Sequence, residues 1–148
     1  MERTWETRHT AETAAAPREV WARWADARRW SEWHPGVEEA HLEGPFLAGT
    51  TALIRFRHRP SLRFLITELE PERIFTDEAR LPFAWLVHEH RIEPRSEGCR
   101  LHHRICLRGP LAPLYGLVAG RRLRAGLIAS VERLARQTTA AAAPAVLA

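Results

Sequence analysis

Hydrophobic residues recur every three or four positions over the last third of the chain, from Leu111 to Gln137. This spacing places them on one side of a helix, whereas arginines largely occupy the other sides. At ~1.5 Å per residue the helix would be roughly 40 Å long. A helix of that length with one apolar side needs an extended partner surface, and we expect a curved sheet. The apolar positions are Leu111, Leu114, Tyr115, Val118, Leu123, Leu127, Val131 and Leu134.

Before this helix the pattern changes to an alternation of apolar and polar residues, which predicts strands. In the segment 50–58, for example, Ala52, Ile54 and Phe56 share one face. Glycine and proline pairs such as Gly44-Pro45 mark turns between such segments. The expected strands cover residues 5–12, 37–42, 50–58, a segment beginning at 62, 74–79, 83–93 and 99–107.

Two short helices are expected between the first and second strands. Pro17 suits the first turn of one helix, because a backbone N–H would have no helical partner there. Asp26 can cap the other helix, and Pro35-Gly36 ends it. The order is therefore strand, two short helices, six strands and a long helix, which predicts an α+β domain.

The length and composition indicate one domain. A chain of 148 residues can form a single core, and a hydrophobic content of 45% with six tryptophans excludes disorder for most of it. We place the domain at residues 2–137 and expect the Ala-rich tail 138–148 to be flexible. The start Met1-Glu2-Arg3 lacks the apolar core of a signal peptide, so we expect a cytoplasmic location.

The charge pattern excludes two classes of partner. All 22 basic residues are arginines, and with 18 acidic residues the net charge is only +4. The arginines are scattered rather than gathered on one face with aromatics, so we expect no nucleic-acid binding. The apolar run 111–120 is too short to span a bilayer and is followed by arginines at 121, 122 and 124, so we expect no stable membrane insertion. The oligomeric state, monomer or homodimer, stays open.

The two cysteines cannot bridge within one chain. Cys99 and Cys106 lie seven apart on one predicted strand, about 23 Å if extended, with side chains on opposite faces. A disulfide needs Cα atoms closer than about 7 Å. Reduced thiols are consistent with the cytoplasm.

Three glycines, Gly116, Gly120 and Gly126, lie inside the predicted long helix, where each costs about 1 kcal/mol relative to Ala. They could allow the sheet to approach closely or the helix to bend. Alternatively, the missing side chains could leave room for a ligand.

Three short segments carry a resemblance to a known family. They are the Pro17-Arg-Glu-Val-Trp21 segment, the segment from Asp26 through Trp30 to Trp33-His-Pro-Gly36, and the segment Gly109-Pro-Leu-Ala-Pro-Leu114. In these the chain resembles the START-like (SRPBCC) superfamily, and within it the polyketide cyclase/dehydrase and lipid-transport group. The resemblance implies a helix-grip fold, in which a seven-stranded antiparallel sheet wraps the C-terminal helix around an apolar cavity. Members bind lipids, sterols, polyketides or other apolar molecules, and only some are enzymes.

The predicted hairpin of residues 83–93 and 99–107 holds the most informative polar residues. A turn centred on Ser96-Glu97 would pair His90 with His103, and Leu86, His88 and His90 would face inward with His103. A slip of one residue would instead turn Trp85, Val87 and Glu89 inward. The resemblance favours the first register. Ile105 stands where an acidic residue is frequent in the family, which weakens any proposal of a carboxylate base on this strand.

Three interpretations of His88, His90 and His103 remain open. In the first they are half-buried residues satisfied by neighbours or water, in the second they hydrogen-bond a polar group of a ligand, and in the third they bind a metal. No suitable fourth ligand supports the metal site, and we expect neither a metal nor a cofactor. Four carboxylates are interpreted mostly as solvent-facing, although an inward one with a raised pKa could act as a general base; they are Glu68, Glu70, Asp77 and Glu89.

The resemblance and the missing nucleophile and phosphate-binding motifs favour a binding protein for a small hydrophobic or aromatic molecule. The expected ligand-binding residues are Trp33, Phe56, Phe64, His88, His90, His103, Ile105, Tyr115 and Val118. The alternative is a polyketide cyclase or dehydratase in which His90 or His103 transfers a proton. A third possibility is a protein that delivers a lipid or quinone to a partner, which would show an exposed apolar patch near the cavity mouth.

Overall fold

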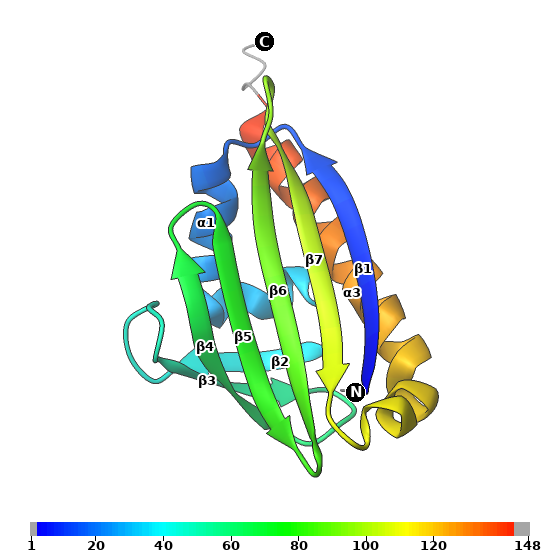
Figure 1. The fold of residues 1–148 in the computed structure, drawn as a ribbon. Coiled ribbons are helices and arrows are strands. Elements are labelled where there is room, and N and C mark those ends of the chain that lie inside the picture. The colour runs from blue at the N-terminus through cyan, green and yellow to red at the C-terminus, as the bar shows by residue number, and fades with distance from the viewer. Residues whose placement is uncertain (1–2, 144–148) are drawn as a thin grey trace.

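The computed structural model describes residues 3–143 and shows a curved antiparallel sheet holding a long C-terminal helix (Figure 1). This is the helix-grip α+β fold that the sequence predicts. The elements in chain order are β1 (Thr4–Thr13), α1 (Pro17–Ala25), the 3₁₀ turn η1 (Ala27–Arg29), α2 (Trp30–Trp33), β2 (Val37–Leu42), β3 (Thr51–Phe56), β4 (Leu62–Glu70), β5 (Ile74–Leu81), β6 (Ala84–Pro94), β7 (Cys99–Arg108) and α3 (Ala112–Ala142).

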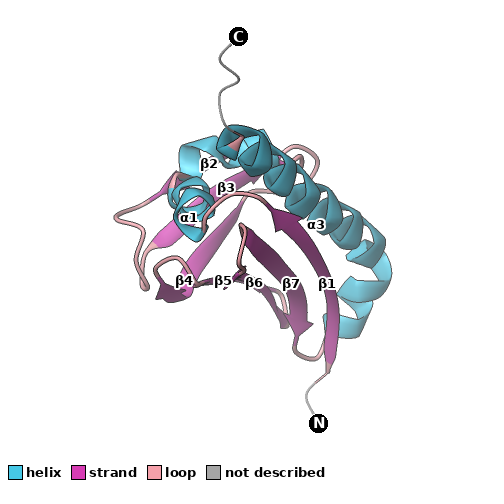
Figure 2. Ribbon diagram, turned by 90° about the horizontal axis from the view of Figure 1, so that it is seen from above, coloured by secondary structure: helices cyan, strands magenta, loops and turns pink. Residues whose placement is uncertain are grey.

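The seven strands lie in the order β1-β7-β6-β5-β4-β3-β2, all antiparallel. The first strand therefore pairs with the last, and β2 to β7 form a meander. Register shifts in β2 between Val37 and Glu39 and in β4 between Ile66 and Glu68 mark bulges, which bend a sheet. Figure 2 shows the result, with α1 and α3 over the concave side of the sheet.

The short helices form for local reasons. Pro17 is the first residue of α1, and the Glu19 carboxylate accepts a hydrogen bond from the Ala16 N–H at 3.2 Å. Trp24 is fully buried at the end of α1. The Trp30 indole N–H donates to the Trp24 carbonyl oxygen at 2.9 Å, which fixes α2 against α1.

The long helix continues past Gln137, where the sequence predicts a flexible tail, and ends at Ala142. Alanine-rich sequence favours helix, and Thr138 anchors this part because its buried hydroxyl lies 2.7 Å from that of Thr13 on β1. Residues 138–142 therefore belong to α3. The rest of the predicted tail, 144–148, lies outside the described residues.

Two of the three glycines in α3 permit close packing. A Cβ added at Gly116 or Gly120 would lie 2.5 Å or 2.9 Å from the indole of Trp5, so both positions need glycine for the helix to approach β1. No atom lies within 4 Å of a Cβ added at Gly126. The close-approach interpretation thus holds for Gly116 and Gly120.

These glycines also set the rotation of α3. Gly116, Gly120, Leu123 and Leu127 are buried, so they define the inner face. Val118 lies two positions beyond Gly116, about 200° around the helix, and is 78% exposed. The predicted inward position of Val118 is therefore wrong, as is that of Leu114. The three- and four-residue spacing also fits this second apolar stripe, so spacing alone did not distinguish the two.

Candidate functional site

The concave face of the sheet carries a group of polar side chains on β5, β6 and β7. Asp77 pairs across the sheet with His88, and His90 pairs with His103. Asp77, His90 and His103 are buried. The side chains converge beneath α2 and α3, in the interior that the helix-grip fold encloses.

The facing of β6 agrees with the first of the two predicted registers. Leu86 and His90 are buried on the concave side, whereas Trp85 is exposed on the convex side. The pairing of His90 with His103 and of Ile92 with Leu101 is also as predicted. Val87 is buried as well, although it lies on the convex side.

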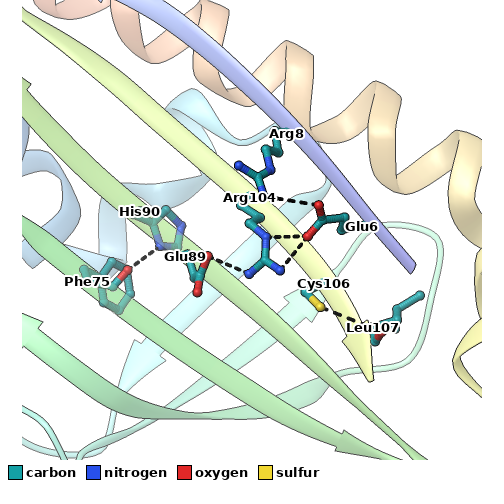
Figure 3. Close-up of polar contacts among 8 residues, drawn as sticks. All are labelled: Glu6, Arg8, Phe75, Glu89, His90, Arg104, Cys106 and Leu107. Carbon is teal, nitrogen blue, oxygen red and sulfur yellow. Dashed lines mark hydrogen bonds and ion pairs between the residues drawn. The ribbon is translucent and has the colours of Figure 1, made fainter. Parts of the chain in front are cut away.

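His90 is held in one orientation. Its Nδ1 lies 2.9 Å from the Phe75 carbonyl oxygen, which can only accept, so Nδ1 carries the hydrogen (Figure 3). The ring stacks on Phe75 at a centroid distance of 4.6 Å and lies 4.7 Å from the ring of His103, nearly perpendicular to it. Nε2 of the neutral His90 ring is therefore a proton acceptor.

Asp77 lies on the inner face, which corrects the interpretation of this residue as solvent-facing. It is 2% exposed, and its Oδ1 lies 3.6 Å from Nδ1 of His88. The neighbours Phe75 and Ala79 are buried beside it. The alternation of Phe75, Asp77 and Ala79 in the sequence could have identified this facing, because two apolar residues flank the aspartate on the same side of the strand.

Burial disfavours the charged form of each member of this group. It raises the pKa of Asp77 well above the usual value, because the carboxylate form would lose its hydration. Burial lowers the pKa of His90 to about 4 and holds the pKa values of His88 and His103 well below the ordinary range. The pKa of the half-buried His34 is lowered to about 4 as well, first by burial and then by the charge of Arg59.

Several buried polar atoms of this group have no hydrogen-bond partner among the described residues. They are Asp77 Oδ1, His88 Nε2, His103 Nε2 and Trp33 Nε1. A buried polar group without a partner costs about 1–3 kcal/mol. These atoms therefore have hydrogen-bonding capacity left for a water molecule or a ligand.

Two small cavities, each of about 30 Å³, lie at these atoms. One reaches Ile105 on β7 and Leu127 and Ser130 on α3. The other reaches Phe56 and Asp77. The residues that line both are Trp33, His34, His88 and His90. A water molecule occupies about 30 Å³, whereas pockets for drug-sized ligands measure ~300–1,000 Å³, so the interior has room for water but not for an aromatic ring.

Most of the predicted ligand-binding residues line these cavities. They are Trp33, Phe56, His88, His90, His103 and Ile105. Phe64 is fully buried with its ring 5.2 Å from that of His88, so it supports the wall. Tyr115 lies elsewhere, because its hydroxyl donates to the Pro82 carbonyl oxygen at 3.2 Å. Asp77, Leu127 and Ser130 also line the cavities and were not predicted, whereas His34, which the resemblance placed with Trp33 at the cavity mouth, lines both cavities.

Two residues that the sequence did not predict, His9 and Glu132, lie between the buried group and the surface. His9 on β1 pairs across the sheet with His103, and its Nε2 lies 2.7 Å from Oε1 of the partly exposed Glu132 on α3. The carboxylate accepts the hydrogen of the His9 ring. Glu132 and His9 thus lead from the surface toward the buried His103.

On the convex face of the same strands, the polar side chains have partners. Arg104, next to His103 in the chain, donates to Glu6 on β1 at 2.7 Å and to Glu89 on β6 at 2.8 Å (Figure 3). His102 on this face lies 2.9 Å from Glu93. Charged side chains here are paired across the strands.

Two negative findings concern residues 3–143. No group of three or more histidine, cysteine, aspartate or glutamate side chains there is arranged to hold a metal ion. Within the same residues, no helix has the length and hydropathy needed to cross a membrane.

The fold and the enclosed interior place the protein among helix-grip proteins. The sequence of residues 4–139 matches the family described as polyketide cyclase / dehydrase and lipid transport, and the chain belongs to that family. This is a fold that binds hydrophobic ligands. Comparison with curated proteins gave no match.

Solved structures with the same fold include norcoclaurine synthase from Thalictrum flavum. A point mutant of that protein, in complex with a transition-state analogue, has a TM-score of 0.75 and 13% identity over 97% of this chain and 99% of that chain. The di-domain ARO/CYC StfQ from the steffimycin biosynthetic pathway has a TM-score of 0.71 and 18% identity over 93% of this chain and 50% of that chain. Both likenesses concern the fold.

Proposed function

We propose that the protein binds a small hydrophobic or aromatic molecule that carries a hydroxyl or carbonyl group, between the sheet and α3. The observation that carries this proposal is the set of unpartnered polar atoms, from Asp77, His88 and His103, at cavities that apolar side chains also line. These apolar side chains include Trp33, Phe56, Ile105 and Leu127. A ligand with an apolar body and one or two polar groups would satisfy both features.

Binding requires the interior to enlarge, and Trp33 is the side chain that would move. It forms a wall of both cavities. Its Nε1 has no partner among the described residues, so displacing the ring would break no hydrogen bond there. It belongs to α2, a helix of only four residues that precedes a turn containing Gly36. A ring in place of Trp33 would lie beside His34, His88 and His90.

Relatives support this class of ligand. The family description includes lipid transport and polyketide cyclisation. A structure of norcoclaurine synthase holds dopamine and hydroxybenzaldehyde, both of which are aromatic molecules with hydroxyl groups. At 13% identity this supports the choice of test ligands and no residue role.

A pair of test ligands separates the apolar and polar parts of the proposal. We would measure the affinities of 2-naphthol and naphthalene by quenching of tryptophan fluorescence and confirm them by calorimetry. The protein should prefer 2-naphthol by roughly 2- to 10-fold, the value of one hydrogen bond of about 0.5–1.5 kcal/mol. His103→Phe should reduce that preference, whereas Trp33→Ala should strengthen binding of both ligands.

Trp85→Ala is the matched control, because Trp85 lies on the convex face, partly exposed. It should leave both affinities unchanged. Native mass spectrometry of the purified protein would also detect a retained natural ligand. Absence of binding by both the wild type and Trp33→Ala, up to the solubility of the ligands, would contradict the proposal.

A specific observation also favours the enzyme as a second candidate. Burial raises the pKa of Asp77 and so favours its protonated, acid form, while the pKa of His90, lowered to about 4, keeps that ring a base near neutral pH. A neutral acid and a neutral base in one cavity are suited to proton transfer, which contributes about 10²–10⁴-fold to a rate. Either His90 or His103 would take the proton, and Asp77 could supply one.

Proton abstraction from 5-nitrobenzisoxazole is a direct test, because this small aromatic molecule loses a carbon-bound proton to a general base. The candidate predicts a rate above that of buffer, lost in His90→Ala or His103→Ala and kept in His102→Ala on the convex face. Equal rates in the two inner variants and the wild type would remove both histidines from such a mechanism.

A further inference from the structure

We propose that the first turns of α3 and the adjacent β5–β6 turn form a docking surface for an anionic lipid membrane. We call this surface the α3 patch. Its apolar members are Phe83, Leu114, Leu117 and Val118, and its basic members are Arg80, Arg121, Arg122 and Arg124. The proposal is independent of the interior ligand, because none of these residues lines the two central cavities.

The apolar residues of the α3 patch project outward. Leu117 is 83% exposed, Val118 is 78% exposed and Phe83 is 74% exposed. Leu114 is more than half exposed on the same outer side of the helix. Side chains that protrude so far do not form a groove for a partner's side chains, but they suit insertion into the interfacial region of a bilayer.

The helix and the turn are held together at one end of the molecule (Figure 1). The backbone N–H of Leu111 donates to the Phe83 carbonyl oxygen at 3.1 Å. The Tyr115 hydroxyl donates to the neighbouring Pro82 carbonyl oxygen at 3.2 Å. The β5–β6 turn and the first turns of α3 therefore form one rigid surface rather than two separate loops.

Phe83 has a strained backbone conformation. Its φ is +56°, in the left-handed region that a residue with a side chain rarely adopts. With Pro82 before it, this turn position would be filled by glycine without strain. An exposed phenylalanine here therefore stabilises neither the turn nor the core, which indicates a role at the surface.

The charge around the α3 patch identifies the partner. No acidic residue occurs from Cys99 to Val131 or from Ala79 to His88. Arg80, Arg121, Arg122 and Arg124 are exposed, and none forms an ion pair within residues 3–143. An apolar surface surrounded by unpaired arginines complements anionic lipid head groups above acyl chains.

The same charges disfavour a second copy of the chain as the occupant. A two-fold contact through the α3 patch would place each set of four arginines against an identical set, and like charges across an interface are repulsive. A lipid surface satisfies both the apolar residues and the arginines.

Vesicle co-sedimentation of the full chain tests this proposal. Vesicles of phosphatidylcholine would be compared with vesicles that contain about 30% phosphatidylglycerol, at low salt and at about 0.3 M NaCl. The wild type should bind the anionic vesicles at low salt, bind them less at high salt, and bind the neutral vesicles weakly. Replacing Arg121, Arg122 and Arg124 by Gln should reduce partitioning on the order of 100-fold, at about five-fold per arginine.

Two further variants examine the apolar part. Phe83→Gly relieves the backbone strain, so folding is preserved while partitioning should fall roughly five- to ten-fold. The double change Leu117→Ser with Val118→Ser should have at least that effect. Leu47→Ser and Arg28→Gln, which change exposed residues elsewhere on the surface, serve as controls and should retain wild-type binding.

Four results would overturn the proposal. One is absence of binding to anionic vesicles at low salt. Another is an equal loss in the control variants and the α3 patch variants. A third is a dimer of the wild type, seen by light scattering, that the Leu117 and Val118 changes dissociate. The fourth is equal binding to poly-glutamate and to anionic vesicles, because the apolar residues would then have no role.

Discussion

The two faces of the β6–β7 hairpin differ in whether their polar side chains have partners. On the convex face Arg104 lies between two carboxylates, Glu6 and Glu89. On the concave face the preceding residue in the chain, His103, is buried and its Nε2 has no partner among the described residues. One strand thus presents satisfied charges to water and an unsatisfied neutral ring to the interior.

This difference separates polar residues that stabilise the sheet from those that do not. Cross-strand ion pairs at the surface contribute about 0–1 kcal/mol each and need no further partner. Buried polar atoms without partners lower the stability of the fold, by about 1–3 kcal/mol each. An interior of apolar residues would be more stable, so we interpret the concave set as a binding site.

The largest difference in the free energy of unfolding should be between variants of the tryptophans on the two faces. Trp33→Ala removes a buried ring from the cavity wall and should lower the free energy of unfolding by about 3–5 kcal/mol, whereas Trp85→Ala on the convex face should cost about 1 kcal/mol. Urea denaturation measures both changes. Addition of 2-naphthol should recover part of the loss in Trp33→Ala only. Equal losses in the two variants would show that α2 is not packed as described.

The next effect is the dependence of stability on pH. The folded pKa of His90, about 4, lies below the unfolded value of about 6.5, so its stabilising contribution is complete above pH 6.5 and is lost as pH falls toward 4. For His90 alone the loss is about 3 kcal/mol. Its buried neighbours His88 and His103 act in the same direction, and the raised pKa of Asp77 acts oppositely.

Urea denaturation from pH 8 to pH 4 tests this sign. His90→Phe combined with His103→Phe should flatten the curve below pH 6.5. His102→Phe is the matched control, because His102 is adjacent in sequence but lies on the convex face beside Glu93. A curve that falls as steeply in the double variant as in the wild type would contradict the assignment of acid sensitivity to the concave face.

Carboxyl groups on the two faces should respond in opposite directions. Asp77→Asn removes a buried group that must lose its hydration when ionised, and at pH 8 it should raise the free energy of unfolding by about 1–2 kcal/mol. Glu89→Gln removes a partner of Arg104 and should lower the free energy of unfolding by up to about 1 kcal/mol. Denaturant midpoints at one pH compare them. A loss of stability in Asp77→Asn would indicate an ionised, paired Asp77.

The smallest effect concerns salt. Arg104→Gln should cost about 1 kcal/mol at low salt and less at about 0.5 M NaCl, because the partly exposed Glu6 and Glu89 partners are screened. His103→Phe, one position away, should show no such salt dependence. A salt-independent loss in Arg104→Gln would mean that its alkyl chain, rather than its charge, supports the sheet.

Sequence periodicity predicted the order of strands and helices, because each element carries a local signal, and the family resemblance implied the helix-grip arrangement. The change from alternation to three- and four-residue spacing at Gly109-Pro110 separates the sheet from α3. The sequence also predicted the pairing of His90 with His103, because the position of the turn fixes the register of a hairpin. Pairing between neighbours in sequence is the part of a sheet that local patterns specify.

The predictions from sequence were wrong where tertiary contacts determine which way a side chain faces. The rotation of α3 depends on Trp5, more than 100 residues away, packing on Gly116 and Gly120. Periodicity alone could therefore not place Val118 outside. Asp77 was assigned to solvent because an isolated aspartate is usually exposed. The contribution of His34 depends on how α2 folds over the sheet, which no local pattern specifies.

The central claim is that His103 has a free, uncharged ring nitrogen that awaits a ligand's polar group. Imidazole ¹⁵N NMR of the full chain, titrated with pH and with ligand, measures this directly. The account predicts a His103 pKa well below 6.5, and a shift of its Nε2 resonance on adding 2-naphthol but not naphthalene, with His102 unaffected by either ligand. A His103 pKa at or above 6.5, or a resonance that does not respond to bound 2-naphthol, would contradict it.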